Sequence, residues 1–272
     1  MAFPGARPTP ADVDPEAADY VVVGAPLDAS TTFEPGTRFG PRRIRHYAQA
    51  FDDYDRRTDQ RFTDLGVADH GDIGPTDDVD EYLTFLADTI ERYDEDGVVP
   101  LLLGGEHAVT IAALRALEPD VYVCTDAHLD LYEEYAGNPL SHATVTHHAL
   151  AVADRVVLLG ARTGSKHEWE RVDANADRID VVPPETVDDW SPALDDGERA
   201  YLSVDVDAAD PAYAPGTGTP EPFGLTSTQL RDVVRAVAPH AVGFDVVEVN
   251  DRDDGQAATL AAKLLREFVF SR

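Results

Sequence analysis

Short apolar runs alternate along this chain with segments whose apolar residues recur at helical spacing, and this alternation limits the folds it can adopt. About eight such runs occur, at residues 20–23, 65–68, 98–103, 121–125, 155–160, 179–182, 201–204 and 241–247. Runs that are apolar throughout are typical of strands buried on both faces of a parallel sheet. Strands separated by helices indicate an α/β fold. We therefore predict a three-layer α/β/α sandwich with a central, mostly parallel sheet of about eight strands.

The segments between the runs have the spacing of amphipathic helices. They predict helices near residues 41–48, 78–93, 107–117, 141–151, 165–174, 227–238 and 256–268. Residues 1–18 are rich in Pro and Asp, which is typical of an extended or partly ordered N-terminal tail. No internal repeat or shift of composition divides the remainder, and 272 residues can bury one large core. Residues 19–272 are therefore predicted to form a single domain.

The chain is strongly acidic. It carries 52 Asp and Glu against 22 Lys and Arg, a net charge of −30, and only two of its basic residues are lysines. Disorder is one explanation of such charge, but 43% of the residues are hydrophobic and fall in regular runs. Asp-rich, Lys-poor surfaces resemble those of halophilic archaea, so we expect a folded protein of a high-salt cytoplasm. A nucleic-acid partner is not expected, because no basic patch is present to meet phosphates.

No segment has the pattern of a membrane span or a signal peptide. The apolar stretches fall short of the roughly 18 residues that a membrane helix needs, and the N-terminus lacks the basic and apolar regions of a secretory signal. Cys124, the single cysteine, lies in an apolar run and is expected to be a buried thiol, so no intrachain disulfide can form. These features predict a soluble, cytoplasmic protein.

Residues that commonly bind metals follow the apolar run at 121–125. They are Asp126, His128 and Asp130, in the stretch Asp-Ala-His-Leu-Asp. In an extended chain, residues at i, i+2 and i+4 lie on one face, so these side chains would point the same way if the extended conformation continues. Two carboxylates and an imidazole at the end of a strand can hold a divalent metal.

Two further runs end in residues of the same kind. His107 follows residues 98–103 through Gly-Gly-Glu, and Asp205 and Asp207 follow residues 201–204. Taken singly, each has an ordinary explanation, as a helix cap or as loop carboxylates in an Asp-rich chain. Sites in open parallel sheets form where the carboxyl ends of the strands meet, so residues far apart in sequence can converge there. Their joint occurrence favours a shared site.

The predicted site contains four carboxylates and two imidazoles. Its members are His107, Asp126, His128, Asp130, Asp205 and Asp207. Gathering four carboxylates in a buried cleft is costly unless cations compensate their charge. Two divalent ions would do so, and shared carboxylates can bridge metals roughly 3.5–4 Å apart. Oxygen-rich ligation with two histidines suits Mn²⁺, while Zn²⁺, Co²⁺ and Ni²⁺ remain open as substitutes.

The motifs resemble those of the ureohydrolases, the arginase and agmatinase family of binuclear manganese enzymes. The matching blocks are Gly-Gly-Glu-His at 104–107, Asp-Ala-His-Leu-Asp at 126–130, Ser-Val-Asp-Val-Asp at 203–207, Asp-Pro-Ala-Tyr-Ala-Pro-Gly-Thr-Gly-Thr-Pro at 210–220 and Gly-Phe-Asp-Val-Val-Glu-Val-Asn at 243–250. The resemblance covers most of the chain and is strongest to agmatinases, particularly archaeal ones. It implies an arginase-like fold and hydrolysis of a guanidinium group to urea and a primary amine, most plainly agmatine to putrescine.

The resemblance also implies a role for each ligand. One Mn²⁺ would be held by His107 and Asp130 and the other by His128 and Asp207, with Asp126 and Asp205 bridging both.

Further roles follow from the same motifs. His142 would deliver a proton to the leaving amine, Glu248 would anchor the guanidinium, Thr219 would line the substrate pocket, and Asp130 would also stabilise the tetrahedral intermediate. Members of the family form trimers or hexamers, so a homo-oligomer is expected, with a small guanidino compound as substrate.

Several positions depart from the family pattern. Glu106 replaces the usual Asp before the ligand histidine, Phe223 replaces a Gly, Tyr132 replaces an Arg of several archaeal relatives, and Asp251 replaces a Pro. Because none of these is a proposed ligand, the departures bear on which amine substrate is used. Arginine, aminopropyl-agmatine and guanidinobutyrate are the alternative substrates. A formiminoglutamase, a calcineurin-like phosphoesterase and a catalytically inactive homologue are less favoured alternatives.

Overall fold

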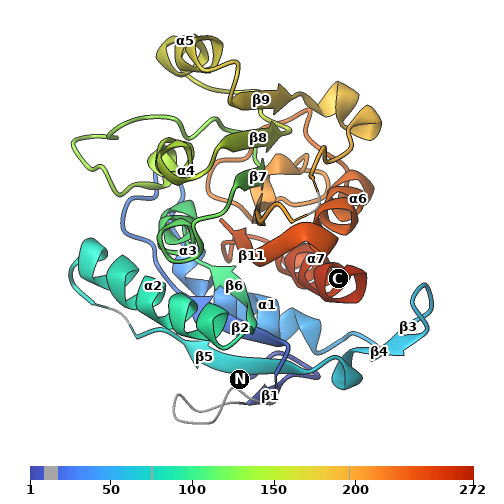
Figure 1. The fold of residues 1–272 in the computed structure, drawn as a ribbon. Helices are drawn as coiled ribbons and strands as arrows, with labels where there is room; N and C mark the ends of the chain where they lie inside the picture. Colours follow the sequence, from blue (N-terminus) through green and yellow to red (C-terminus); the bar gives the residue numbers. More distant parts are fainter. Residues whose placement is uncertain (9–17, 75, 196) are drawn as a thin grey trace.

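A nine-stranded parallel sheet forms the middle layer of the protein, seen in a computed structural model that describes residues 1–8, 18–74, 76–195 and 197–272 (Figure 1). The strands are β1 (Arg7–Pro8), β2 (Tyr20–Ala25), β5 (Val67–Asp72), β6 (Val99–Gly104), β7 (Val121–Thr125), β8 (Arg155–Leu159), β9 (Ile179–Val182), β10 (Ala200–Asp205) and β11 (Ala241–Val247). Their order across the sheet is β1-β5-β2-β6-β11-β10-β7-β8-β9, and every pair is parallel. The predicted three-layer α/β fold is confirmed.

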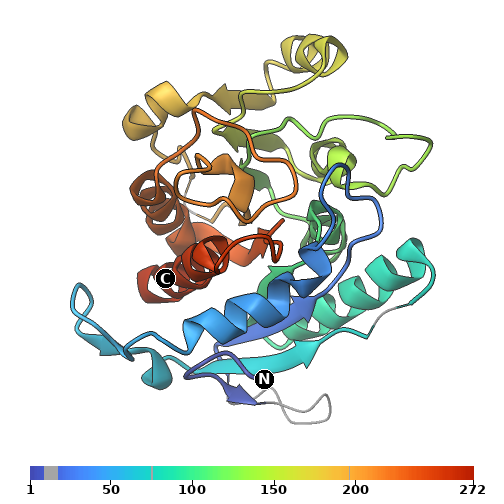
Figure 2. The same ribbon diagram turned by 180° about the vertical axis from the view of Figure 1, so that it is seen from behind.

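Helices cover both faces of the sheet (Figures 1 and 2). They are α1 (Gly40–Ala48), α2 (Val79–Glu95), α3 (Thr110–Leu117), α4 (Val145–Val152), α5 (Lys166–Ala174), α6 (Ser227–Val237) and α7 (Gln256–Ser271). Apolar residues of α1, α6 and α7 pack in one core on one face, and those of α2, α3 and α4 pack in a second core on the other. The sheet is therefore buried on both sides, which explains why its strands are apolar throughout.

Local sequence sets where the helices begin. The side chain of Asp78 accepts a hydrogen bond from the N–H of Glu81 at the start of α2. Reciprocal capping boxes begin α5, between Ser165 and Glu168, and α6, between Thr226 and Gln229. These caps satisfy N–H groups that a helix leaves unpaired at its first turn. The predicted helices at 107–117 and 141–151 each begin with a short 3-10 turn, His107–Val109 and His142–Thr144.

The sheet has one strand more than the eight predicted, because the N-terminus adds to its edge. Arg7–Pro8 pairs with β5, and Phe3 is buried against Phe62 at a ring distance of 5.7 Å. Residues 9–17 of the predicted tail lie outside the described residues. A small antiparallel pair, β3 (Tyr54–Asp55) and β4 (Gln60–Arg61), was also not predicted.

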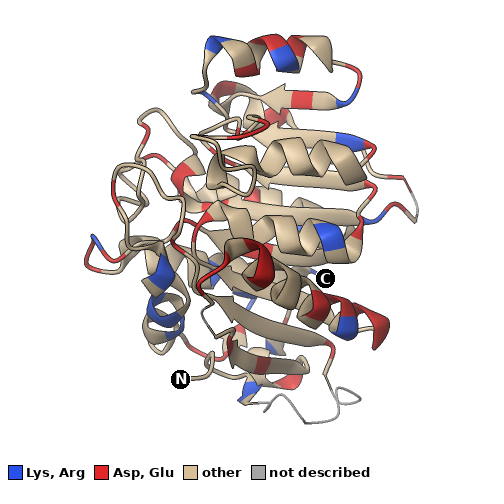
Figure 3. Cartoon of the chain, turned by 90° about the vertical axis from the view of Figure 1, so that its left-hand side faces the viewer, with Lys and Arg blue, Asp and Glu red and all other residues tan. Residues whose placement is uncertain are grey.

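The four middle strands carry the predicted site. In the sheet, β6, β11, β10 and β7 are successive neighbours, although they come from distant parts of the chain. Each runs in the same direction, so the residues that follow their carboxyl ends meet at one edge. Among the described helices, none combines the length and apolar character that crossing a membrane requires. The positions of Asp and Glu, coloured red, are spread over the helices and loops, with few positions of Lys and Arg between them (Figure 3).

Candidate metal centre and active site

Turns, rather than continued strand, bring the two carboxylate motifs together. β7 ends at Thr125, and the N–H of His128 donates to Oδ1 of Asp126 at 2.6 Å. In the same way, the N–H of Asp207 donates to Oδ1 of Asp205 at 2.9 Å. The first aspartate of each motif thus closes its own loop as an Asx turn. The condition that the extended conformation continues past residue 125 is therefore not met, although the side chains do converge.

One group of ligands surrounds Nδ1 of His107, and we call it the His107 cluster. This nitrogen lies 2.9 Å from Oδ2 of Asp130, 3.2 Å from Oδ2 of Asp126 and 3.5 Å from Oδ2 of Asp205. All four side chains are buried, with at most 7% of any residue exposed. Asp130 has a positive φ of 47°, an uncommon conformation for a non-glycine residue that is frequent at functional sites.

A second group surrounds Nδ1 of His128, and we call it the His128 cluster. This nitrogen lies 3.1 Å from Oδ2 of Asp207 and 3.5 Å from Oδ1 of Asp126. Asp126 therefore presents one oxygen to each cluster, which is the geometry of a bridging carboxylate. Asp205 contacts the His107 cluster through Oδ2, while its Oδ1 accepts the N–H of Asp207. Its bridging role stays a prediction.

The electrostatics of the carboxylates fit bound cations. Burial and the neighbouring Asp126 raise the pKa of Asp130 to about 7. Burial, Asp207 and Asp126 raise the pKa of Asp205 well above its usual value. Burial also opposes ionisation of Asp126, but hydrogen bonds from His107 and His128 outweigh it and lower its pKa. Cations bound between these carboxylates would reduce the repulsion that raises the pKa values of Asp130 and Asp205. Oxygen and imidazole donors arranged in two clusters match divalent metals, so the residues present fit a two-metal centre.

Cys124 lies near this centre without facing it. Its Sγ is 3.8 Å from Nε2 of His107, whereas the carboxylates gather at Nδ1, on the other side of the ring. Cys124, His107 and Asp126 are close enough together to hold an ion. Burial, however, raises the pKa of Cys124 to about 11, which keeps the thiol protonated, and only the thiolate is a metal ligand. The prediction of a buried, free thiol is confirmed.

A hydrogen-bonded chain that the sequence analysis missed lies behind His107. Its Nε2 is 3.2 Å from Oγ of Ser203 and 3.3 Å from the hydroxyl of Tyr122. Ser203 in turn donates to Oδ1 of Asp245 at 2.6 Å, and both residues are fully buried. Such a chain fixes the ring orientation and the protonated nitrogen of a metal-binding histidine. Both residues fall in motifs quoted above, but the sequence pattern around them predicts only that they lie inside strands, not that they contact each other.

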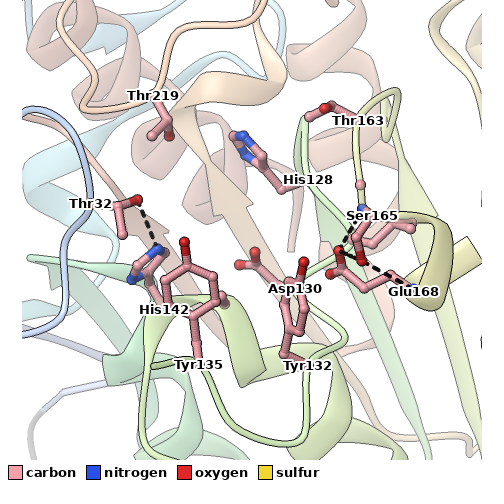
Figure 4. Close-up of a pocket in the computed structure, with 13 residues that line it drawn as sticks. Thr32, His128, Asp130, Tyr132, Tyr135, His142, Thr163, Ser165, Glu168 and Thr219 are labelled. Atoms are coloured by element: carbon pink, nitrogen blue, oxygen red, sulfur yellow. Dashed lines mark hydrogen bonds between the residues drawn. The ribbon is translucent and has the colours of Figure 1, made fainter. Parts of the chain in front are cut away.

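His142 and Thr219 reach the pocket beside the His128 cluster. The ring of His142 lies near Ser30 and Thr32, with Nδ1 3.1 Å from Oγ of Ser30 and Nε2 3.4 Å from Oγ1 of Thr32 (Figure 4). Thr219 donates from Oγ1 to Oδ2 of Asp207 at 3.2 Å. Burial, followed by the charges of the ligand histidines, lowers the pKa of His142 to about 4.

Glu248 lies at the end of β11, behind the pocket and next to His107. Its Oε1 accepts the backbone N–H of His107 at 2.8 Å, and its own N–H donates to the carbonyl of Gly105 at 2.9 Å. Burial raises its pKa well above the usual value, and Glu106 and Asp207 add to the effect. Its φ of 62° is a second uncommon backbone conformation at the site. The structure therefore places Glu248 beside the metal centre, but not among the residues lining the pocket.

The pocket is a cavity of about 240 Å³ that opens beside His128 and Asp130 (Figure 4). Its lining residues are Thr32, His128, Leu129, Asp130, Tyr132, Tyr135, His142, Ala143, Thr163, Gly164, Ser165, Glu168 and Thr219. The rings of Tyr132 and Tyr135 stand edge to face with their centroids 5.4 Å apart. Of the departures from the family pattern, Tyr132 thus reaches the pocket, whereas Phe223 is 81% exposed and does not line it.

This protein has the features of a two-metal hydrolase: a parallel sheet whose carboxyl edge carries two neighbouring clusters of carboxylates and imidazoles. A profile of the arginase family matches residues 18–271, and the chain belongs to this family.

Three similar proteins show the range of substrates found among relatives. The agmatinase of Bacillus anthracis is 36% identical over 270 residues, covering 93% of this chain and 92% of the relative. The guanidinobutyrase of Pseudomonas aeruginosa is 35% identical over 288 residues, covering 96% and 88%. The crystal structure of the agmatine ureohydrolase of Thermoplasma volcanium is 34% identical and superposes with a TM-score of 0.91, covering 100% of this chain and 94% of that one. The predicted hydrolase of the arginase family and its fold are confirmed.

Proposed function

We propose that this protein hydrolyses agmatine to putrescine and urea with two Mn²⁺ ions. The observation that carries the proposal is the charge of the pocket beside the clusters. Of the residues that the structure describes, the lining includes the carboxylates of Asp130 and Glu168 and the two tyrosines, and neither Lys nor Arg. A site of this charge favours a substrate whose far end is an ammonium group, as in agmatine.

The same charge argues against substrates with a carboxylate tail. Arginine and guanidinobutyrate would bring a carboxylate next to Glu168, which is itself 2% exposed. Both oxygens of Glu168 already accept hydrogen bonds, from the N–H of Leu131 and from the N–H and hydroxyl of Ser165. A second carboxylate beside Glu168 would be repelled, because like charges in a partly buried site repel strongly. Aminopropyl-agmatine has a cationic tail and is the alternative that this pocket also favours.

The residues of the clusters would hold the two metals as the family resemblance implies. Asp126 and Asp205 would bridge, with His107 and Asp130 on one ion and His128 and Asp207 on the other. Ions held in this way supply Lewis-acid activation of a water molecule at neutral pH.

The chain's own residues would orient the substrate and move its protons. Glu248 does not line the pocket, so its role as guanidinium anchor rests on the family resemblance. Its Oε1 accepts the N–H of His107, and Oε2 would accept hydrogen bonds from the guanidinium. Asp130 lines the pocket and would accept a hydrogen bond from the nitrogen of the tetrahedral intermediate. His142 would take up a proton at Nε2 and release it to the leaving amine. Tyr132 and Tyr135 would pack along the aliphatic chain of the substrate and keep water from it.

A panel of guanidino compounds tests this assignment. The protein loaded with Mn²⁺ is assayed for urea release from agmatine, aminopropyl-agmatine, arginine and guanidinobutyrate, together with metal analysis. We expect agmatine to have the highest kcat/KM and the two carboxylate-bearing compounds to be at least about tenfold poorer, a difference of about 1.4 kcal/mol. A preference for guanidinobutyrate or arginine overturns the substrate assignment. Release of urea from none of the four, with two metals bound, favours an inactive homologue.

We propose further that the protein works as a homo-oligomer, as the family resemblance implies, in the cytoplasm of a halophile, and the acidic composition supports the halophilic part. With a net charge of −30, self-repulsion is screened only at high ionic strength. Activity and thermal unfolding are therefore measured from dilute buffer to molar KCl, with light scattering to find the number of subunits. Full folding and activity in dilute buffer contradict the halophilic part without affecting the substrate assignment.

A further inference from the structure

Glu106, the residue before the ligand His107, is fully buried and holds the loop at residues 29–31. Its Oε2 accepts the N–H groups of Ala29 at 2.7 Å, Ser30 at 2.7 Å and Thr31 at 3.2 Å, and the hydroxyl of Thr31 at 3.3 Å. Its Oε1 accepts the hydroxyl of Ser30 at 2.8 Å, and no second donor to Oε1 occurs among the described residues. The two oxygens therefore have different partners.

Ser30 links this carboxylate to His142. A serine hydroxyl has one proton, and Ser30 donates it to Glu106. Toward His142 its oxygen can then only accept. It accepts the backbone N–H of His142 at 3.0 Å and lies 3.1 Å from Nδ1 of the ring. For this second contact to be a hydrogen bond, Nδ1 must carry the proton, which leaves the lone pair of a neutral imidazole on Nε2.

We propose that Glu106 is a positioning residue that fixes the tautomer of His142 through Ser30, so that Nε2 faces the pocket as the proton-accepting nitrogen. Figure 4 shows His142 at the rim of the pocket, with Nε2 toward Thr32. Nε2 takes up the proton that the attacking water loses, which gives the imidazolium, and passes it to the leaving nitrogen, so the group ends as it began. This inference rests on the proton-transfer role proposed for His142, but its structural part is measured without turnover.

Ser141 is the competing partner of the same nitrogen. Its Oγ lies 3.3 Å from Nδ1 of His142, and it accepts the N–H of Ala143. If Ser141 donated to Nδ1, the proton of the ring would sit on Nε2 instead. The geometry favours Ser30, whose contact is shorter and whose oxygen also accepts the backbone N–H of His142. Variants of Glu106, the partner of Ser30, and of Ser141 itself separate these two cases.

Glu106→Gln is the decisive variant. Four donors converge on Oε2, so the amide oxygen of the glutamine takes that place and its NH₂ group faces Ser30 in the place of Oε1. Four of the five hydrogen bonds of Glu106 are kept. Ser30 then accepts from the amide and turns its own proton toward Nδ1 of His142. The tautomer of His142 should reverse while the loop remains in place.

The tautomer is read from ¹⁵N solid-state NMR of the histidine-labelled full chain loaded with Zn²⁺, with the His142 signals identified by their loss in His142→Asn. We expect the Nδ1–H tautomer in the wild type and Nε2–H in Glu106→Gln. Thr31→Val, which removes a donor to Oε2 only, and Ser141→Ala should keep the wild-type tautomer. An Nε2–H wild type, an unchanged tautomer in Glu106→Gln, or a reversal in Ser141→Ala overturns the proposal.

Kinetics and metal content distinguish positioning from a structural effect. In Glu106→Gln we expect kcat to fall about 10- to 100-fold, with KM within about twofold and two metals still bound, because general acid–base catalysis contributes about 10²–10⁴ in rate. If kcat of Glu106→Gln falls only in proportion to the metal that is lost, Glu106 does not act through His142. If the wild type releases no urea from any guanidino compound, the proposed function fails, while the tautomer measurement still decides the structural inference.

Discussion

The two ligand clusters share Asp126 but differ in what supports their histidines. Behind His107, Nε2 faces the hydroxyls of Ser203 and Tyr122, and Ser203 continues to the buried Asp245. The side chain of His128 is 27% exposed and lines the pocket, and no hydrogen-bond partner of its Nε2 occurs in the described part of the chain. The difference indicates that the His107 cluster is built into the core of the sheet, whereas the His128 cluster faces the substrate.

Asp126→Asn is expected to have the largest effect, because among the described residues Asp126 is the one carboxylate that contacts both histidines. An amide has no negative charge and only one acceptor oxygen, so this variant could not bridge two metals. We expect bound metal to fall below two per subunit and kcat to fall by more than the roughly 10–100-fold that loss of an outer ligand contact costs. Metal analysis after dialysis and urea release measure the two losses.

Asp180→Asn is the matched control, since Asp180 is an exposed aspartate on β9 of the same sheet. It should keep both metals and full turnover. Two bound metals and wild-type turnover in Asp126→Asn would contradict its place in both clusters.

Substituting the two histidines in turn tests the difference between the clusters directly. In metal-free protein, His107→Asn removes one hydrogen-bond partner from each of the buried hydroxyls of Ser203 and Tyr122, and it removes positive charge from among buried aspartates, at a cost of about 1–3 kcal/mol. His128→Asn affects a partly exposed side chain and should cost less. We expect a Tm for His107→Asn that is roughly 2–8 °C below that of His128→Asn. Equal Tm values would mean that the chain behind His107 adds no stability.

The sequence predicted which candidate ligands converge at one edge of the sheet, because these residues follow apolar runs closely; their binding of metals stays a prediction. Once residues 121–125 and 201–204 are assigned to parallel strands, Asp126 and Asp205 must lie at one edge of the sheet. What lay beyond prediction were contacts between distant residues with no local pattern. Examples are the bond from Ser203 to Asp245, which depends on the pairing of β10 with β11, and the bond from Ser30 to Glu106.

The N-terminal edge of the fold was missed for a related reason. Arg7–Pro8 joins the sheet as a two-residue strand, which is too short to have a periodicity, and the burial of Phe3 depends on its contact with Phe62. The turn after β7 was missed because an Asx turn and an extended strand can have the same sequence of residue types.

Ser203→Ala is expected to weaken metal binding at the His107 cluster but not at the His128 cluster. It removes the hydroxyl between His107 and Asp245, so His107 loses the partner that holds its ring and fixes the proton on Nε2. We expect metal affinity at the His107 cluster to fall about 10–100-fold and that at the His128 cluster to stay the same. Isothermal titration of the metal-free protein should then show one weakened and one unchanged step. Equal weakening of both steps would mean that Ser203 supports the whole centre and not His107 in particular.

The smallest expected effect is a pH dependence that comes from Asp130, a member of the His107 cluster alone. Its pKa is raised to about 7 in the folded, metal-free protein, against about 3.9 in an unfolded chain. Between these values the unfolded state binds fewer protons, so Asp130 lowers the free energy of unfolding as the pH rises from about 4 to about 7.

The Asp130→Asn variant tests this pH dependence. Its amide side chain cannot ionise, so its free energy of unfolding does not fall in this way as the pH rises. In metal-free protein, the Tm of Asp130→Asn should therefore rise relative to the wild type from pH 5 to pH 8, by a few degrees. The same proton competes with metal, so wild-type affinity at the His107 cluster should increase up to about tenfold per pH unit below 7. A Tm difference that is constant with pH would show that Asp130 ionises freely, and the crowding of carboxylates around His107 would then be no argument for a bound cation.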